Sequence, residues 1–324
     1  MRVVVIGATG HIGSYLVPRL VEEGFDVVTI SRGQRRPYHS HPAWDQVTQI
    51  VADRDAEDAA GTFGRRVAEL KPDGVVDLIC YTPESAAKLV EGLGRNVGLL
   101  VSCGSIWVHG PGTQVPTRED APRRPFGWYG TAKAEIEKLL LDQSRKAGTP
   151  TTILHPGHIT GPGWPVINPA GNLDLDVWNR LATGQKVTLP NFGLETVHHV
   201  HAKDVAEGFV LALQRPRDAL SQSSHMVSEQ ALTLRGFAEE VAGWFGQEAN
   251  LEFVPFEEFR RVTAPEHAAA TWEHISRSPS ISMRKAEFGL EYEPEYTSLQ
   301  AVREAVEWMQ AAGWLKTGPL QAVS

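Results

Sequence analysis

The chain has 324 residues, of which 42% are hydrophobic and 22% charged, as is ordinary for a globular protein of one large domain or two smaller ones. A formal net charge of −8 argues against a nucleic-acid binder that depends on phosphate contacts, and no apolar run reaches the length of a membrane helix. Only two cysteines occur, so we expect no disulfide framework and a reducing, cytoplasmic setting. Because the chain opens on a strand, no signal peptide is expected.

The first sixteen residues predict a strand, a glycine-rich turn and the start of a helix. Val3 to Ile6 form an apolar, β-branched run, which is typical of a buried parallel strand. In the turn that follows, successive glycines permit a tight bend, an approach of the main chain to a pyrophosphate, and close packing of helix on strand. Amide groups at the helix start favour a diphosphate. We therefore expect a dinucleotide site formed by Gly7, Thr9, Gly10, His11, Ile12 and Gly13.

The second strand, residues 27–30, ends at a cluster of arginines. At this place in dinucleotide-binding folds, an acid binds the ribose 2′-hydroxyl of NAD, whereas an arginine accommodates the 2′-phosphate of NADP. The acid is absent here, so we predict a preference for NADP, with solvated loop charges as the alternative. The expected contacts are Ser31, Arg32, Arg35 and Arg36. Asp53 and Arg54 follow the third strand, residues 47–51, where a carboxylate commonly contacts adenine, and both belong to the expected cofactor site.

Strands and helices then alternate along the chain. Helices are expected over 11–24, 57–70, 83–93 and 128–147, and strands over 75–80, 99–102 and 151–154, with a proline-rich loop over 111–125. This alternation predicts an α/β fold of the Rossmann type, a doubly wound parallel sheet with helices on both faces. Later elements are a helix over 173–183, a strand over 196–201 and helices over 203–213 and 299–311. We assign 1–165, with a return segment near 196–214, to the dinucleotide domain, and 166–195 with 215–324 to a smaller C-terminal α/β substrate lobe.

Tyr129 and Lys133 lie four residues apart on a predicted helix, so their side chains share one face. A free tyrosine has a pKa of about 10, and we expect the nearby ammonium to lower it. Tyr129 can then exchange a proton with a substrate hydroxyl while hydride moves to or from a nicotinamide. Lys133 is also expected to hold the ribose. Ser105, after the fifth strand, can hydrogen-bond the substrate oxygen, with a turn or cap serine as the alternative.

These motifs resemble the extended short-chain dehydrogenase/reductase family, in the branch of nucleotide-sugar epimerases and dehydratases. The resemblance is carried by the opening glycines and by the segments 105–110, 155–163 and 200–206. It implies that Ser105, Tyr129 and Lys133 form a catalytic triad and that two copies pair through the helix of Tyr129. It further implies that the nicotinamide is lined by Pro156, His158 and Ile159, and we place Cys80 and Tyr81 at the same cofactor edge.

Two departures from the family narrow the chemistry. Ile106 and Trp107 stand where dehydratases of the family carry an Asp-Glu pair, so we exclude dehydratase chemistry. Near Val197 the chain lacks the arginine with which nucleotide-sugar enzymes often hold the diphosphate, which puts a nucleotide-diphosphate substrate in doubt. Arginines of the second lobe are candidates to replace it, namely Arg260, Arg261, Arg277 and Arg284.

We therefore expect an NAD(P)-dependent oxidoreductase or epimerase that acts on a secondary alcohol or ketone of a sugar-like substrate. One alternative is an NADPH-dependent ketone or aldehyde reductase of a non-nucleotide small molecule. Another is a non-catalytic member of the atypical branch that binds RNA or a ligand, against which the intact triad and the acidic charge argue. No metal is expected, because His198 points away from the strand face that His199 and His201 share. Trp107 and Trp164 are placed where they can border the substrate.

Overall fold

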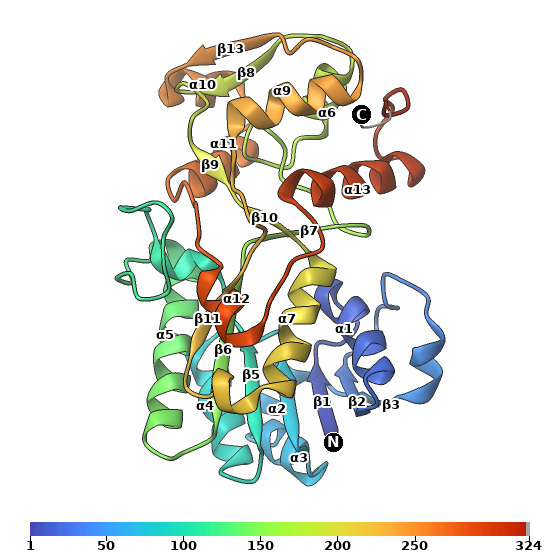
Figure 1. Ribbon diagram of the computed structural model, residues 1–324, viewed down its shortest axis with the longest axis vertical. Coiled ribbons are helices and arrows are strands. Elements are labelled where there is room, and N and C mark those ends of the chain that lie inside the picture. Colours follow the sequence, from blue (N-terminus) through green and yellow to red (C-terminus); the bar gives the residue numbers. More distant parts are fainter. Residues whose placement is uncertain (322–324) are drawn as a thin grey trace.

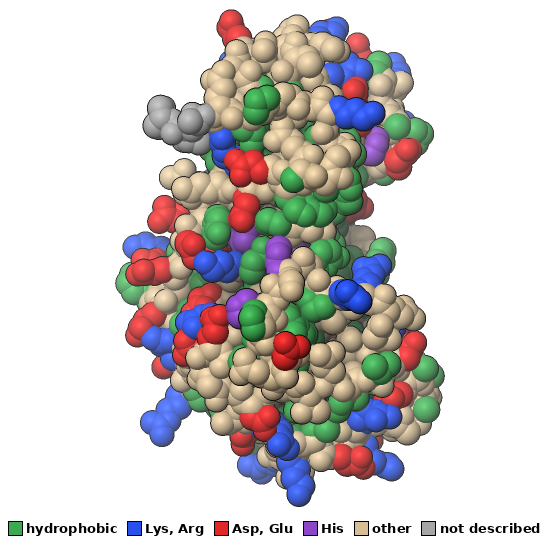
Figure 2. Space-filling model, turned by 90° about the vertical axis from the view of Figure 1, so that its right-hand side faces the viewer, with side chains coloured by type: hydrophobic (Ala, Val, Ile, Leu, Met, Phe, Trp, Pro, Cys, Tyr) green, Lys and Arg blue, Asp and Glu red, His purple; other side chains and the backbone are tan. Residues whose placement is uncertain are grey.

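The computed structural model describes residues 1–321 as two lobes (Figure 1). The larger lobe is built on a seven-stranded sheet, and the smaller lobe lies beyond the carboxyl ends of its strands. Histidine and hydrophobic side chains gather on the surface at the level where the two lobes meet (Figure 2). Among the described residues, no helix combines the length and apolarity needed to span a bilayer.

The large sheet confirms the predicted Rossmann-type architecture. All of its neighbouring strands are parallel. In spatial order they are β3 (Thr48–Val51), β2 (Asp26–Ser31), β1 (Arg2–Ile6), β4 (Gly74–Asp77), β5 (Leu99–Cys103), β6 (Thr151–Pro156) and β11 (Ser223–Met226). The chain reverses its direction of travel across the sheet between β1 and β4, and ligands of open α/β sheets bind at the carboxyl edge beside such a point.

Helices cover both faces of this sheet, as predicted. On one face the core is formed with α1 (His11–Glu22) and α7 (Ala202–Gln214), whose apolar side chains pack on alternate residues of the strands. On the other face it is formed with α3 (Phe63–Glu69), α4 (Pro83–Leu93) and α5 (Gly127–Arg145). The central strands β1, β4 and β5 are buried on both faces, which explains their apolar runs, whereas the edge strand β3 is largely exposed.

Three elements differ from the sequence-based expectation. The single helix expected over 57–70 is two helices, α2 (Arg54–Ala59) and α3, because Gly61 between them has a φ of +68° that ends the first. The strand expected over 196–201 is divided into β9 (Thr196–Val197) and β10 (His199–His201), which pair with different partners. Residues 158–160, for which the sequence predicts no strand, form the short strand β7 (His158–Thr160) beside β10.

The boundary between the lobes also differs from the expected one at residue 215. The seventh strand, β11, belongs to the large sheet, and α12 (Arg284–Leu290) packs in the core of the same lobe. Parallel pairing of β11 with β6 puts these late segments beside the end of β6, a long-range contact that no local sequence pattern specifies. The α8 helix (Pro216–Ala219) connects α7 to this strand.

The smaller lobe has its own hydrophobic core, in which Trp178 and Phe237 are fully buried. Its strands are β8 (Val187–Pro190), paired in parallel with β13 (Leu251–Val254), and β12 (Leu232–Thr233), which is antiparallel to β9. Its helices are α6 (Leu175–Ala182), α9 (Leu234–Trp244), α10 (Phe256–Val262), α11 (Pro265–Ile275) and α13 (Ser298–Ala311). The predicted helices over 173–183 and 299–311 are thus confirmed with small shifts of their ends.

Candidate active site

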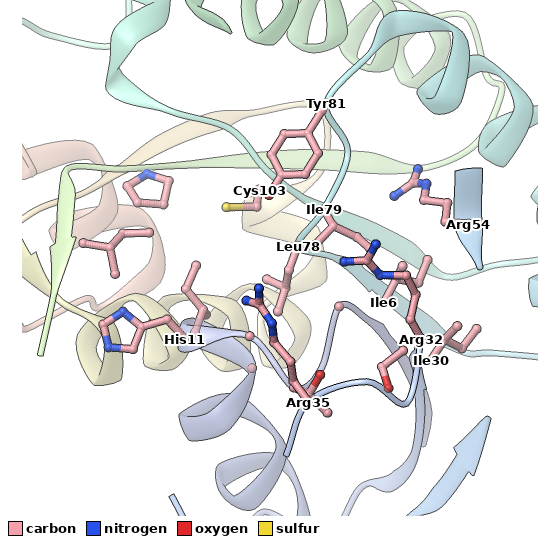
Figure 3. Close-up of a pocket in the computed structure, with 18 of the residues that line it drawn as sticks. Ile6, His11, Ile30, Arg32, Arg35, Arg54, Leu78, Ile79, Tyr81 and Cys103 are labelled. Carbon is pink, nitrogen blue, oxygen red and sulfur yellow. The ribbon is translucent and has the colours of Figure 1, made fainter. Parts of the chain in front are cut away.

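A cavity of about 470 Å³ lies at the carboxyl edge of the large sheet, within the usual size range of small-molecule sites (Figure 3). It is lined from the ends of β1, β2, β4, β5 and β6, the edge at which ligands of this architecture bind. The sequence-predicted residues that line it are Gly7, Thr9, Gly10, His11, Ile12, Gly13, Ser31, Arg32, Arg35, Asp53, Arg54, Tyr81, Ser105, Tyr129, Lys133, Pro156 and Ile159.

The glycine turn leads from β1 into α1 along the wall of this cavity. Gly7 has a φ of +84°, which only glycine adopts readily, and a Cβ on Gly13 would lie 2.1 Å from the main-chain oxygen of Ala8. The helix therefore begins in direct contact with the turn. Gly10, the residue before α1, makes no side-chain capping hydrogen bond, so the free amide groups of the first turn remain available to a ligand. This wall fits a diphosphate.

The arginines after β2 do not all behave alike. Arg32 and Arg35 extend from the loop into the cavity (Figure 3), and within residues 1–321 no carboxylate lies within 4 Å of either guanidinium. Arg36 does not line the cavity. Arg54 lines it but is buried in ion pairs, 2.6 Å from Asp77 and 3.4 Å from Asp58. Arg32 and Arg35 are thus the two that can meet a phosphate.

Ser105, Tyr129 and Lys133 converge at the other end of the cavity. Lys133 is 2% exposed, and its Nζ donates to the main-chain oxygens of Cys80 (2.8 Å) and Cys103 (2.7 Å). An ammonium has three N–H groups, so one remains for a ligand. Ser105 begins the short helical turn of residues 106–109 by accepting a hydrogen bond from Trp107 N, and its hydroxyl lies near enough to Tyr129 to lower the pKa of the phenol.

The pKa of Tyr129 is raised rather than lowered, which corrects the expectation from the sequence. Burial is the main cause, because it disfavours the phenolate, and the neighbouring Ser105 hydroxyl offsets only part of it. Lys133 instead lowers the pKa of Tyr81, where it opposes the larger effect of burial. Tyr129 is consequently a protonated phenol at neutral pH in this structure, the form that acts as a general acid.

Three other predicted cofactor residues lie outside the cavity lining, namely Arg36, Cys80 and His158. Cys80 contributes its main-chain oxygen to Lys133, while burial raises the pKa of its thiol to about 12. His158 is buried behind the site, where its Nε2 lies 3.4 Å from the indole nitrogen of Trp107. Both residues therefore contact the predicted triad or its neighbours and do not face the cavity themselves.

An aromatic cluster closes the glycine-turn end of the cavity, and the sequence did not reveal it. The ring of His11 stacks on Trp164, with centroids 5.2 Å apart and planes at 10°, and meets the edge of Tyr38 at 5.6 Å. The three residues come from the glycine turn, the arginine loop and the loop after β7, and all line the cavity. Trp164 thus lies beside the glycine turn. The contact of Trp107 with the edge of the Tyr129 ring is at the opposite end.

Two of the arginines proposed to hold a diphosphate have other partners, and none of the four lines the cavity. Arg277 is 2% exposed, lies between the rings of Trp107 and Phe126 at 3.7 Å from each centroid, and pairs with Glu273 at 2.6 Å. Arg260 pairs with Glu257 on the surface of α10. Within the described chain, no group of three or more potential metal ligands converges. The strand histidines instead meet main-chain groups, as when His198 Nε2 lies 2.8 Å from the oxygen of Ser228.

The chain resembles known enzymes across much of its length. It is 28% identical over 261 residues to the 2′-dehydrokanamycin reductase of Streptomyces kanamyceticus, covering 79% of this chain and 70% of the relative. It is 27% identical over 244 residues to a UDP-glucose 4-epimerase of Azospirillum brasilense, covering 65% and 68%. A UDP-glucose 4-epimerase of Thermotoga maritima, solved with UDP-glucose, shares its fold at a TM-score of 0.71 and 19% identity, over 96% of this chain and 99% of that one.

The model of the family described as NAD dependent epimerase/dehydratase matches residues 3–226, which is more than half of the chain. The match includes every strand of the large sheet, the glycine turn and the three convergent residues Ser105, Tyr129 and Lys133. The chain therefore belongs to the NAD dependent epimerase/dehydratase family.

Proposed function

We propose that the protein transfers hydride between a nicotinamide cofactor and a secondary alcohol or ketone of a sugar-like substrate. The observation that carries the proposal is the convergence of Ser105, Tyr129 and Lys133 on one end of a cavity whose other end is the glycine turn. This arrangement suits an elongated dinucleotide, with its diphosphate at the helix start and its reactive ring near the phenol.

Each of the three side chains has a separate role in this proposal. When bound, the nicotinamide supplies or accepts the hydride. Tyr129 donates its proton to the carbonyl oxygen in reduction and removes that proton in oxidation. Ser105 hydrogen-bonds the same oxygen, which is within its reach because Ser105 and Tyr129 line the same cavity. Lys133, held by two main-chain oxygens, directs its remaining N–H to the nicotinamide ribose.

We infer that NADP is the preferred cofactor. Arg32 and Arg35 supply positive charge beside the end of β2, where the 2′-substituent of the adenosine ribose is read. The residue at the end of β2 is Ser31, which offers a hydroxyl instead of the acid that favours NAD. Guanidinium groups bind phosphate with charge-assisted hydrogen bonds, so both arginines favour a 2′-phosphate.

A reductase that exchanges its cofactor is favoured by two features of the site. The arginine pair is suited to NADPH, and the protonated Tyr129 is the proton donor that ketone reduction requires. An epimerase is the second candidate, favoured by the similarity to UDP-glucose 4-epimerases. It would retain its cofactor and return the hydride to the opposite face of the same carbon. The similarity to a 2′-dehydrokanamycin reductase supports a sugar-like ketone that carries no nucleotide.

Two enzyme assays distinguish the reductase from the epimerase. Protein passed through gel filtration is supplied with NADPH and 2′-dehydrokanamycin, or with UDP-galactose and no added cofactor. NADPH oxidation in the first assay supports the reductase, and formation of UDP-glucose in the second supports the epimerase. In either case Tyr129→Phe should abolish turnover and keep NADPH binding, measured by cofactor fluorescence. Failure of the wild-type protein to bind NADPH or NADH would overturn the proposal and favour a non-catalytic binding protein.

The same proposal includes pairing of two copies through α5 in a cytoplasmic setting. Trp128, near the start of that helix, is 74% exposed and therefore accessible to a second copy. Both cysteines are buried free thiols, which suits a reducing compartment. Sedimentation equilibrium should give the mass of two chains, and a Trp128→Arg variant should shift it toward one.

A further inference from the structure

The main chain of Ser105 is held by a histidine from the neighbouring strand. Its N–H donates to His155 Nδ1 over 2.9 Å, and His155 is fully buried in β6. A Cβ on Gly104 would lie 2.2 Å from this nitrogen, so the imidazole packs directly against the backbone that precedes Ser105. A ring nitrogen that accepts an N–H carries no proton of its own. The contact therefore fixes the tautomer of His155 as well as the position of Ser105.

The second nitrogen of this ring meets a carboxylate. His155 Nε2 lies 3.1 Å from Glu137 Oε1, and with Nδ1 unprotonated it is Nε2–H that donates. Arg123 binds both oxygens of the same carboxylate, at 2.6 Å and 2.8 Å. Burial raises the pKa of Glu137, but the hydrogen bonds from Arg123 and His155 and the charge of Arg123 outweigh it and hold that pKa well below its usual range. Glu137 is thus a charged acceptor that orients the imidazole.

One face of α5 carries this carboxylate together with the predicted catalytic groups. Tyr129, Lys133 and Glu137 follow one another at intervals of four residues, so they lie along the same side of the helix. Lys133 binds the main-chain oxygen of Cys103, and Glu137 reaches the amide of Ser105 through His155. The helix that supplies the phenol therefore also fixes the backbone at the end of β5 from two directions.

A series of hydrogen bonds through His225 and His109 leads to Arg123, and the donor and acceptor of each bond can be assigned. His225 Nδ1 lies 2.9 Å from the oxygen of Ser282, so this nitrogen carries the proton and Nε2 accepts from His109 Nε2 over 2.8 Å. His109 Nδ1 is then free to accept from Arg123 Nη1, which is 3.4 Å away. Burial lowers the pKa of His109 to about 3, and also that of His225, which keeps both rings neutral. Arg123 therefore has a single favoured orientation toward Glu137.

We propose that His155 is a positioning residue for the hydride-transfer reaction: oriented by Glu137 and Arg123, it fixes the main chain of Ser105 so that the serine hydroxyl stays beside Tyr129 at the cavity. The inference rests on the proposed function, because it takes Ser105 and Tyr129 as the groups that meet the substrate oxygen. None of His155, Glu137 and Arg123 lines the cavity, so they act through Ser105 and not on the substrate.

Substitutions at His155 test this role in the full chain. His155→Leu removes the acceptor for Ser105 N–H, whereas the side-chain oxygen of His155→Asn can occupy the position of Nδ1 and accept that N–H. With NADPH and 2′-dehydrokanamycin, or with UDP-galactose, kcat of His155→Leu should fall about tenfold, the equivalent of one hydrogen bond. The Kd for NADPH should not change, and His155→Asn should recover most of the lost kcat.

Thr152→Val provides the matched control, because Thr152 is also buried on β6 and its hydroxyl bonds only the main-chain oxygen of Gln222 among the described residues. It should lose stability and keep its kcat per folded molecule. Equal kcat values for His155→Leu and Thr152→Val would overturn the proposal, since the effect of His155 would then be on folding alone.

Nitrogen-15 NMR gives a readout that needs no substrate. In protein labelled at histidine, His155 should show an unprotonated Nδ1 and a protonated Nε2 at neutral pH, and the Ser105 amide proton should shift upfield in His155→Leu but not in His155→Asn. A protonated Nδ1 would overturn the proposal. Retention of turnover by Tyr129→Phe would instead sink the proposed function and leave these signals unchanged, so the two failures are distinguishable.

Discussion

The Nζ atom of Lys133 lies 5.6 Å from the ring centre of Tyr129, on the buried side of the helix that carries both residues. The ring of Tyr81 lies 5.1 Å from the same ammonium, so the charge sits between two phenols. Its hydrogen bonds to Cys80 and Cys103 join the ends of two neighbouring strands. Lys133 therefore has a structural role in addition to its proposed contact with a cofactor.

Lys133→Met should lower both turnover and stability. The loss of the ammonium removes a proposed ribose contact and the charge beside Tyr129, so kcat should fall by about 100-fold or more. Two buried main-chain oxygens also lose their donor, at a cost of about 1–3 kcal/mol each in the free energy of unfolding. Steady-state kinetics and urea unfolding measure the two effects. Lys138→Met, an exposed lysine on the same helix, is the control and should change neither quantity appreciably.

Arg35→Ala should weaken binding of NADPH without weakening that of NADH. The guanidinium lines the cavity and is proposed to meet only the 2′-phosphate, so the Kd for NADPH should rise about tenfold or more. Arg36→Ala is a close control, because its neighbouring guanidinium does not line the cavity and its loss should leave both affinities unchanged. Calorimetric titration with the two cofactors decides the point. A wild-type protein that binds NADH more tightly than NADPH would contradict the inferred preference.

Trp164→Ala should accelerate loss of the cofactor. Stacking of Trp164 on His11 closes the end of the cavity where the diphosphate is proposed to bind, and an aromatic pair contributes about 0.5–1.5 kcal/mol. We therefore expect the dissociation rate of NADPH, followed by stopped-flow fluorescence, to rise about three- to tenfold. Trp314 is comparable in exposure to Trp164, and Trp314→Ala also removes an aromatic contact, with Trp308, in another part of the molecule. An equal change in both variants would argue against closure by Trp164.

Stability should fall as the pH is lowered from about 6.5 toward 4. Burial lowers the pKa of His198 to about 4 and of His199 to about 3, whereas an unfolded histidine has a value of 6.5. Between these values the unfolded chain binds protons that the native chain does not, so the free energy of unfolding decreases as the pH is lowered. At pH 5 each such histidine costs about 2 kcal/mol.

Urea unfolding at several pH values measures this effect. His198→Gln keeps a hydrogen-bonding side chain that does not titrate. The slope of the unfolding free energy against pH should therefore decrease by the contribution of about one bound proton. Thr151→Val removes a buried hydroxyl that bonds the main chain of Leu140, and it should lower stability equally at every pH. If His198→Gln left the slope of unfolding free energy against pH unchanged, protonation of other groups would account for the loss of stability at low pH.

Local sequence determined much of the fold. The apolar runs of β1 and β4 and the spacing of apolar residues in α1 reappear in the structure because strand and helix periodicity act over a few residues. The glycine turn was equally readable, since a φ of +84° at Gly7 and the tight packing at Gly13 exclude other residues. The shared face of Tyr129 and Lys133 follows from helix geometry alone.

Tertiary structure decided the features that depend on contacts between distant segments. The stacking of Trp164 on His11 and the insertion of β11 beside β6 join residues remote in the chain. The same packing puts Arg35 at the cavity and leaves the adjacent Arg36 outside its lining. The raised pKa of Tyr129 follows from burial, which is a property of the folded molecule and not of a four-residue spacing. The bond from Ser105 to His155 spans fifty residues. Sequence periodicity records which face a residue occupies, but only the packed chain determines what that face meets.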